Sequence, residues 1–440
     1  AIGAMASCSS SDDPPVDPSA DAAPDGTTLP DTGPPTMDAG PDAPPDAGPF
    51  DGAAPAIVCE SPPCAISLST TRGRFSTDFN GQYVEDPAEG FCALLRDGTV
   101  ACWGANGNGQ LGRGPDVTAP ESVVPERVPG VSNIVALDHT CALDNLGKVR
   151  CWGRGPFLRD EQGFVTVEPS PVELPLPPVT RISVGFETGC AIVDGGSRLS
   201  CWGANGGGQI DPDRSLGVLP ARDIALPPGA PLRDVVVGSA TFVIREDGTG
   251  LSWGNNPPLG RMSSLFPDPY PQPLDLSGIF VLDLAHQDAC AIVGGIGHCW
   301  GMSAPRSFAD VGKPLIRRAL PEPIVAPEPI RQIATTDTTV EIYEYRARPS
   351  RWCACGVSGA VYCFGANANG QAGDGTKEYA LEAVKVNLPS PAVEVKVAPT
   401  ATCALLTTGK VFCWGSNFSG QLGFGKLKEP SLVPKEVVLP

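Results

Sequence analysis

The sequence predicts an all-β fold: a seven-bladed β-propeller of four-stranded antiparallel blades. Three observations lead to this prediction. The 440 residues include 52 Gly and 49 Pro, which indicates many turns. No long stretch has apolar residues at helical spacing. One motif recurs seven times at intervals of about fifty residues, and a unit that small must stack on its neighbours to bury a core.

The recurring motif is clearest at Cys92–Gly104, which reads Cys-Ala-Leu-Leu-Arg-Asp-Gly-Thr-Val-Ala-Cys-Trp-Gly. An aromatic residue precedes the final glycine of every copy, and we expect it to pack between blades. These aromatic residues are Trp103, Trp152, Trp202, Trp253, Trp300, Phe364 and Trp414. Several copies continue with Asn-x-x-x-Gln and an apolar residue, as at Asn106–Leu111.

This motif resembles the repeats of the regulator of chromosome condensation family over roughly residues 60–440. The resemblance implies a seven-bladed propeller with four strands in each blade. The founding member exchanges guanine nucleotide on a small GTPase and binds chromatin, activities that depend on particular loops and are not carried over. The formal net charge of −18 and the lack of a basic stripe also argue against a nucleic-acid partner.

Two cysteines stand on the two arms of the hairpin in six of the seven copies. The length of the turn compensates for each difference in spacing, so both cysteines always face each other and we expect a cross-strand disulfide. The six expected bridges are Cys92–Cys102, Cys141–Cys151, Cys190–Cys201, Cys290–Cys299, Cys353–Cys363 and Cys403–Cys413. The fourth copy lacks both members and has Phe242 and Ser252 instead. The alternative is twelve buried thiols in a cytosolic propeller.

The remaining cysteines extend this interpretation. Cys59 and Cys64 are expected to pair, and Cys355, at a leucine position of the motif, is expected to be a buried and inert thiol. Zinc-ligand spacing is absent, so we expect no metal. Because structural disulfides persist in oxidising compartments, the cysteines predict an extracytoplasmic protein, either secreted or on the cell surface.

The N-terminal part predicts a tether. Residues 1–8 resemble the end of a bacterial lipoprotein signal, with Cys8 as the residue that would carry the lipid, although Met5 stands where that pattern prefers Leu. Residues 9–56 hold ten Asp and twelve Pro and predict a disordered linker. The alternatives are an ordinary secreted protein with a stray thiol at Cys8, and calcium binding by the spaced Asp. The propeller is expected at 57–440.

The ring must also close. The last copy ends in a strand-like segment, Glu436–Leu439, and the first copy is preceded by another, Ala65–Ser69. We expect the two chain ends to complete one blade together.

Nothing in the sequence supports catalysis or a cofactor. Paired carboxylates, nucleophile elbows and phosphate loops are missing, and the three histidines do not recur with the motif. His139 is expected to be structural, and His286 and His298 lie in a single copy. We therefore predict that the chain is not an enzyme. Clustered acids and histidines around the central channel would favour the alternative, a propeller-face glycan lyase or hydrolase.

Two long links indicate where a partner would bind. The link before the Cys strand is long in the first and sixth copies, which flank the seventh in a closed ring, so both links should rise near each other on one face. Arg and aromatic residues are enriched at binding hot spots. The links contain Arg72, Arg74, Phe75, Phe79, Tyr83, Tyr343, Tyr345, Arg346, Arg348, Arg351 and Trp352.

The sequence thus predicts a non-catalytic, monomeric, extracytoplasmic propeller that binds an unidentified protein and meets the membrane only through an N-terminal lipid. The alternative for the two links is surface insertions without a role. A purely structural surface protein is the third possibility for the whole chain.

Overall fold

The structure is a computed structural model, and contacts divide the chain into two compact units, Ala1–Gly48 and Pro49–Pro440. All the described residues belong to the second unit. They are residues 50, 52–59, 61–71, 75–77, 83–85, 89–116, 119–157, 166–185, 187–213, 217–285, 288–301, 318–336, 340–342, 345–347 and 351–440. Cys8 and nearly all of the expected linker lie outside the described residues, so the lipid site and the domain limits stay predictions.

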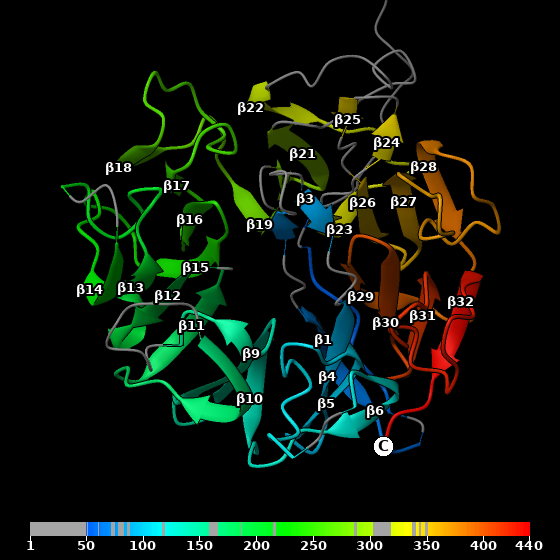
Figure 1. Ribbon diagram of the computed structural model, residues 1–440. Helices are drawn as coiled ribbons and strands as arrows, with labels where there is room; N and C mark the ends of the chain where they lie inside the picture. The colour runs from blue at the N-terminus through cyan, green and yellow to red at the C-terminus, as the bar shows by residue number, and fades with distance from the viewer. Residues whose placement is uncertain are drawn as a thin grey trace, which may run out of the picture. The chain divides into compact units, whose positions relative to one another are not determined.

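The second unit is a seven-bladed β-propeller of four-stranded antiparallel sheets (Figure 1). Blade one contains β1 (Ala65–Thr71), β4 (Gly90–Leu95), β5 (Val100–Ala105) and β6 (Glu121–Arg127). Blade two contains β7 (Ile134–Asp138), β8 (Cys141–Asp144), β9 (Val149–Gly155) and β10 (Thr166–Glu173). Blade three contains β11 (Val179–Val184), β12 (Thr188–Val193), β13 (Arg198–Ala204) and β14 (Val218–Asp223), with a 3-10 turn at Asp194–Gly196.

The other four blades follow the same order. Blade four contains β15 (Leu232–Val237), β16 (Ala240–Arg245), β17 (Gly250–Gly254) and β18 (Asp268–Pro273). Blade five contains β19 (Ile279–Leu284), β20 (Asp288–Val293), β21 (Ile296–Gly301) and β22 (Arg318–Pro323). Blade six contains β23 (Ile330–Thr336), β26 (Arg351–Gly356), β27 (Val361–Gly365) and β28 (Ala380–Val386). Blade seven contains β29 (Ala392–Val397), β30 (Ala401–Leu406), β31 (Val411–Gly415) and β32 (Ser431–Val437).

The second and third strands of each blade form the hairpin that carries the cysteines. Each of the six expected pairs stands at directly opposed positions, and the structure joins each pair by a disulfide with a Cα–Cα distance of 4.1 Å. Blade four keeps the same register with Phe242 opposite Ser252. Cys59 and Cys64 form a seventh bridge, and Cys355 is a buried free cysteine whose pKa burial raises to about 12.

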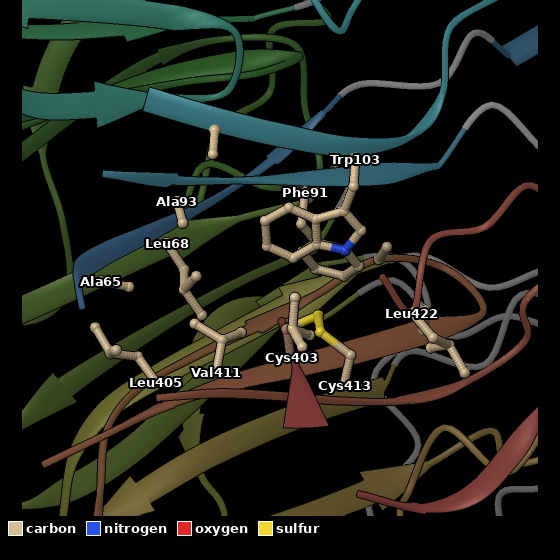
Figure 2. Close-up of a cluster of buried hydrophobic side chains, with 14 of the residues drawn as sticks. Ala65, Leu68, Phe91, Ala93, Trp103, Cys403, Leu405, Val411, Cys413 and Leu422 are labelled. Atoms are coloured by element: carbon tan, nitrogen blue, oxygen red, sulfur yellow. A yellow bond between two sulfur atoms is a disulfide. The ribbon is translucent and has the colours of Figure 1, made fainter. Parts of the chain in front are cut away.

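The blades pack through a contact that the repeat alone does not reveal: six of the seven recurring aromatic rings share a buried cluster with the disulfide of the preceding blade. Figure 2 shows this at one interface, where Trp103 of blade one points toward the Cys403–Cys413 bridge of blade seven. The same arrangement joins Trp152 to Cys92–Cys102, Trp202 to Cys141–Cys151, Trp253 to Cys190–Cys201, Phe364 to Cys290–Cys299 and Trp414 to Cys353–Cys363.

The indoles also hydrogen-bond across these interfaces. The Nε1–H of Trp103 donates to the carbonyl of Gln421 over 3.0 Å, and that of Trp152 donates to the carbonyl of Gln110 over 3.0 Å. Both acceptors belong to the Asn-x-x-x-Gln segment of the preceding blade. The asparagine side chain of that segment holds its loop in shape, since Asn417 Oδ1 accepts the backbone N–H of Leu422. The motif therefore encodes both an indole and its acceptor one blade away.

Blade four replaces its missing disulfide in two ways. The ring of Phe242 fills the corresponding space, 6.1 Å from the ring of Trp300 between centroids. Ser252 accepts a hydrogen bond from Arg261, which forms a buried ion pair with Asp268 at 2.8 Å. Burial raises the pKa of Asp268, but hydrogen bonds from Ser263, Arg261 and the Tyr270 N–H outweigh it, so this pKa lies below its ordinary value.

The expected closure by a shared blade is wrong. Both ends of the chain complete their own blades: β1 pairs with β4, and β32 pairs with β31. The physical reason is that β1 pairs locally with β4, so blade one already has four strands of its own and needs none from the C-terminus. Blade seven lies between blades one and six, as the orange-to-red strands of Figure 1 show.

The seam between blades seven and one is closed by side chains and by an N-terminal strap, residues 50–64. The Leu68 N–H donates to Glu394 Oε2 over 2.8 Å, and the Val58 N–H of the strap donates to the carbonyl of Thr407 over 2.7 Å. At its other end, Phe50 meets the ring of Phe280 edge-on with centroids 6.0 Å apart. The strap thereby connects blade five to the seam.

Candidate functional site

Two hairpins are inserted at equivalent places, between the first and second strands of blades one and six. The first consists of β2 (Phe75–Thr77) and β3 (Tyr83–Glu85), and the second of β24 (Val340–Ile342) and β25 (Tyr345–Ala347). Because the strands of a blade alternate in direction, all links between first and second strands lie on one face of the ring. We call this face, which also carries the loops between third and fourth strands, the insertion face.

The first insertion returns to its blade at Glu89, directly before β4. Glu89 is buried, and its carboxylate accepts two hydrogen bonds from Thr400 of blade seven, from the N–H at 3.0 Å and from Oγ1 at 2.9 Å. Thr400 belongs to the turn between β29 and β30. The end of the first insertion is therefore fixed to a turn of the neighbouring blade on the insertion face.

The second insertion returns at Arg351, and Arg351 is fixed to the start of β30, directly after that turn. The guanidinium donates to the carbonyl of Ala401 over 3.0 Å, to Thr402 Oγ1 over 2.6 Å and to the carbonyl of Gln371 over 3.1 Å. Burial lowers the pKa of Arg351 to about 9, and the negative charge of Glu89 opposes that shift. One short segment of blade seven thus holds the ends of both insertions.

Arg351 and Trp352 are the residues for which the sequence interpretation was wrong. They were expected in the exposed second link, but both lie in β26 and are buried. The strand extends two residues ahead of Cys353, and Trp352 stacks on Phe364 at 5.6 Å between ring centroids. The Arg-rich composition of the link predicted exposed arginines, and composition alone did not show that Arg351 is buried.

The other residues expected to bind a partner fall into two groups. Arg72, Arg74, Phe79, Tyr343 and Arg348 lie outside the described residues. Phe75, Tyr83, Tyr345 and Arg346 lie in the strands of the two hairpins, where Phe75 is opposite Glu85, Tyr83 is opposite Thr77, Tyr345 is opposite Ile342 and Arg346 is opposite Glu341. Their role in binding stays a prediction.

Acidic side chains line the inner strands, as an enzymatic reading would require, but they connect blades. Asp138 accepts the N–H of Val184 in the next blade over 2.6 Å, and Asp283 accepts the N–H of Thr335 over 2.6 Å. Glu394 is already engaged at the seam. Each of these carboxylates satisfies a backbone donor of the following blade, which gives the acids a structural use.

One cationic side chain lies among these acids. Lys396 Nζ is 3.3 Å from Glu394 Oε1. Burial lowers the pKa of Lys396, but the charges of Glu394, Asp283 and Asp138 outweigh this effect and hold the pKa above its ordinary value. Desolvation raises the pKa of Asp234, which faces the same interior. Within the described part of the chain, no three His, Cys, Asp or Glu side chains are placed to hold a metal ion.

The histidines do not gather at a site among the described residues. His139 has a left-handed backbone (φ 50°), and its Nδ1 lies 3.1 Å from Thr70 Oγ1 of blade one. Its carbonyl accepts a hydrogen bond from Ser69 Oγ over 2.8 Å, so it connects blades one and two as a structural residue would. His298 Nδ1 lies 3.2 Å from the carbonyl of Ile296 in its own turn, and His286 lies outside the described residues.

The described residues contain no helix with the length and apolar character needed to span a membrane.

Comparison with known proteins fits this geometry. The pattern of the regulator of chromosome condensation (RCC1) repeat matches residues 97–143 and 400–421. RCC1 repeats are therefore present in this propeller. It is 29% identical over 174 residues to the Ultraviolet-B receptor UVR8 of Arabidopsis thaliana, a match that covers 37% of this chain and 38% of the receptor. It is 27% identical over 247 residues to the mitochondrial RCC1 domain-containing protein RUG3 of the same plant, covering 51% and 54%. The matches thus span about half or less of each relative.

Solved RCC1 propellers share the fold. Prp20p of Saccharomyces cerevisiae, whose structure was described with its binding to Gsp1p and histones, aligns with a TM-score of 0.64 at 19% identity, over 78% of this chain and 87% of that one. Yeast RCC1 (Prp20) in complex with Kap60 gives 0.62 at 19% identity, over 78% and 84%. Human WBSCR16 gives 0.60 at 18% identity, over 78% and 95%.

Proposed function

We propose that this chain is a non-catalytic, extracytoplasmic propeller that binds a protein partner on its insertion face. The observation that carries the proposal is the common attachment of both insertions: Glu89 and Arg351 fix their ends to one short segment of blade seven, Thr400–Thr402. Two extra hairpins held beside one blade form a composite surface from parts far apart in sequence. Solved RCC1 propellers that bind proteins support this use of the fold.

The seven disulfides support the proposed location, because bridges of this number persist in an oxidising compartment. Lipid attachment at Cys8, with residues 9–56 as a spacer, is part of the same proposal. We do not propose catalysis at the channel, since the carboxylates of Asp138, Asp283 and Glu394 accept backbone N–H donors of neighbouring blades.

The test compares the full chain with two triple variants as bait against envelope and culture fractions. Tyr343→Ala, Tyr345→Ala and Arg346→Ala alter the second insertion. The matched control alters Leu146, Ile296 and Val357 to Ala, three exposed residues in the turns between second and third strands, on the opposite face. We expect a partner retained by the wild type and the control to lose at least about tenfold in affinity with the insertion variant. Equal affinity for all three baits would contradict the proposal.

A further inference from the structure

A second feature of the insertion face lies on blade four, in the loop that follows β17 together with β18. Four large apolar side chains of this loop are exposed: Met262 (72%), Phe266 (70%), Tyr270 (50%) and Leu265 (44%). Single exposed apolar residues are normal on a protein surface, whereas a contiguous group marks an interaction site. We call residues 255–273 the apolar loop.

The apolar loop presents no exposed charge. Between Asp247 and Asp275 the only charged residues are Arg261 and Asp268. They form an ion pair with each other, and their side chains are only 7% and 6% exposed. The equivalent loop of blade seven differs, because it carries an exposed ion pair between Lys426 and Glu429 and a second lysine, Lys428, over the ring of Phe418. Moving the apolar loop out of water would therefore remove no exposed charge from its hydration shell.

Part of the backbone of the apolar loop is also satisfied internally. Six prolines, at positions 257, 258, 267, 269, 271 and 273, have no N–H to desolvate. Carbonyl groups along the loop accept side-chain donors: Asn256 Nδ2 donates to Ser263 and Leu265, Arg261 to Tyr270, Ser252 to Leu259 and Trp300 to Pro258. An apolar medium requires this kind of internal satisfaction, because it offers no hydrogen bonds in return. A polar protein surface would instead be met by free donors and acceptors.

The loop is held in one conformation before it meets anything. The Arg261–Asp268 pair lies beneath it, Ser263 Oγ donates to Asp268 Oδ2 over 2.7 Å, and the Leu265 N–H donates to Ser263 Oγ over 3.1 Å. Holding a loop in its bound shape lowers the entropy lost on binding. The exposed part of the apolar loop is thus uncharged, braced by hydrogen bonds from below and rich in Met, Leu, Phe and Tyr, the character of segments that enter the interfacial layer of a bilayer.

We infer that the apolar loop of blade four, through Met262, Leu265, Phe266 and Tyr270, inserts into the interfacial layer of an electrically neutral lipid bilayer. The net charge of the chain, −18, selects the neutral surface, since anionic headgroups would repel it. This contact is independent of the partner surface formed by the insertions of blades one and six and of any lipid at Cys8. It would orient the propeller with its insertion face toward the membrane.

The test is flotation of the full chain with phosphatidylcholine vesicles, with and without added phosphatidylserine. All proteins carry Cys8→Ser, so no lipid is attached. The variant is Met262→Ser with Phe266→Ser, and the matched control is Phe418→Ser, which removes a 55% exposed ring from the equivalent loop of blade seven. We expect the wild type and the control to float with neutral vesicles, phosphatidylserine to weaken flotation, and the double variant to partition about tenfold less or lower. Unchanged thermal melting of the variant shows that the fold is kept.

A second measurement reports insertion itself. An environment-sensitive dye attached to Phe266→Cys should shift to shorter emission wavelengths when phosphatidylcholine vesicles are added, and the same dye on Phe418→Cys should not. Failure of the wild type to float, equal flotation of wild type and double variant, or equal dye shifts at the two positions would overturn the inference. Apolar docking on a protein alone would give the first of these results.

Discussion

Replacing Trp103 with Phe tests how the ring closes. Trp103 is fully buried against the Cys403–Cys413 bridge and donates its indole N–H to the carbonyl of Gln421 across the seam. A phenyl ring would keep the aromatic contact but lose the donor and part of the volume. Leaving the buried carbonyl without this donor costs about 1–3 kcal/mol. The smaller ring costs about 1–2 kcal/mol more. We therefore expect Trp103→Phe to lower the free energy of unfolding by about 2–5 kcal/mol.

The matched variant is Trp152→Phe, which removes the same kind of bond, also 3.0 Å long, between blades one and two. Urea unfolding followed by far-ultraviolet circular dichroism gives the two losses. In a ring closed by side-chain packing, the seam is an interface like the others, so both variants should lose comparable stability. A change of less than about 0.5 kcal/mol for Trp103→Phe, beside the full loss for Trp152→Phe, would refute this account of the seam.

Three further predictions concern single side chains. Because the pKa of Asp268 is lowered in the folded chain, its stabilising contribution is complete above the ordinary value of 3.8 and is lost as the pH falls through the folded value. Asp268→Asn should therefore lower the free energy of unfolding at pH 7. In acid titrations the variant should also lose less stability below about pH 4 than the wild type does, and an equal loss in both would contradict the prediction. Glu394→Ala should cost about 1–3 kcal/mol in urea unfolding by leaving the Leu68 N–H without its acceptor, and the exposed control Glu436→Ala should be nearly silent. Cys355 should resist alkylation in the native state, because it is buried and its pKa is raised to about 12; modification at the rate of an exposed thiol would contradict its placement.

The repeat made most of the fold readable from the sequence. The period of the motif determines how many blades there are, and turn length determines the register of each hairpin. Both follow from local rules of strand pairing, which is why the opposition of Cys190 and Cys201 was predictable despite their longer turn. The missing disulfide of the fourth copy was also predictable, because Phe242 and Ser252 stand at the two cysteine positions.

What the sequence did not show lies between blades. The stacking of Trp103 on a disulfide of blade seven depends on the angle between sheets, which a linear period does not contain. Closure depends on whether Ala65–Thr71 finds a partner in its own blade, and it pairs with β4. The position of Arg351 was missed because burial of a guanidinium needs three acceptors from two blades, and only the folded ring brings them together.

The candidate surface was predictable in place but not in structure. Unequal spacing of the aromatic residues located the insertion of blade six, and the long link from Ser69 to Cys92 located that of blade one, because extra residues between strands must leave the ring at a link. Their common attachment to the segment Thr400–Thr402 through Glu89 and Arg351 could not be read from composition. The apolar loop escaped notice because Arg261 and Asp268 make its sequence look charged, and only their burial as a pair reveals an uncharged surface.

The central claim is that this is an exported propeller whose blades are stapled across their hairpins and packed on those bridges. Peptide mapping without reduction, on the chain purified from its native host under thiol-blocking conditions, tests this most directly. The account predicts linked peptides for all six cross-strand pairs, a Cys59–Cys64 link and a single blocked thiol at Cys355. If Cys92 and Cys102 carry the blocking reagent, they were free thiols in the native chain. That result would contradict both the cross-strand disulfides and the oxidising compartment.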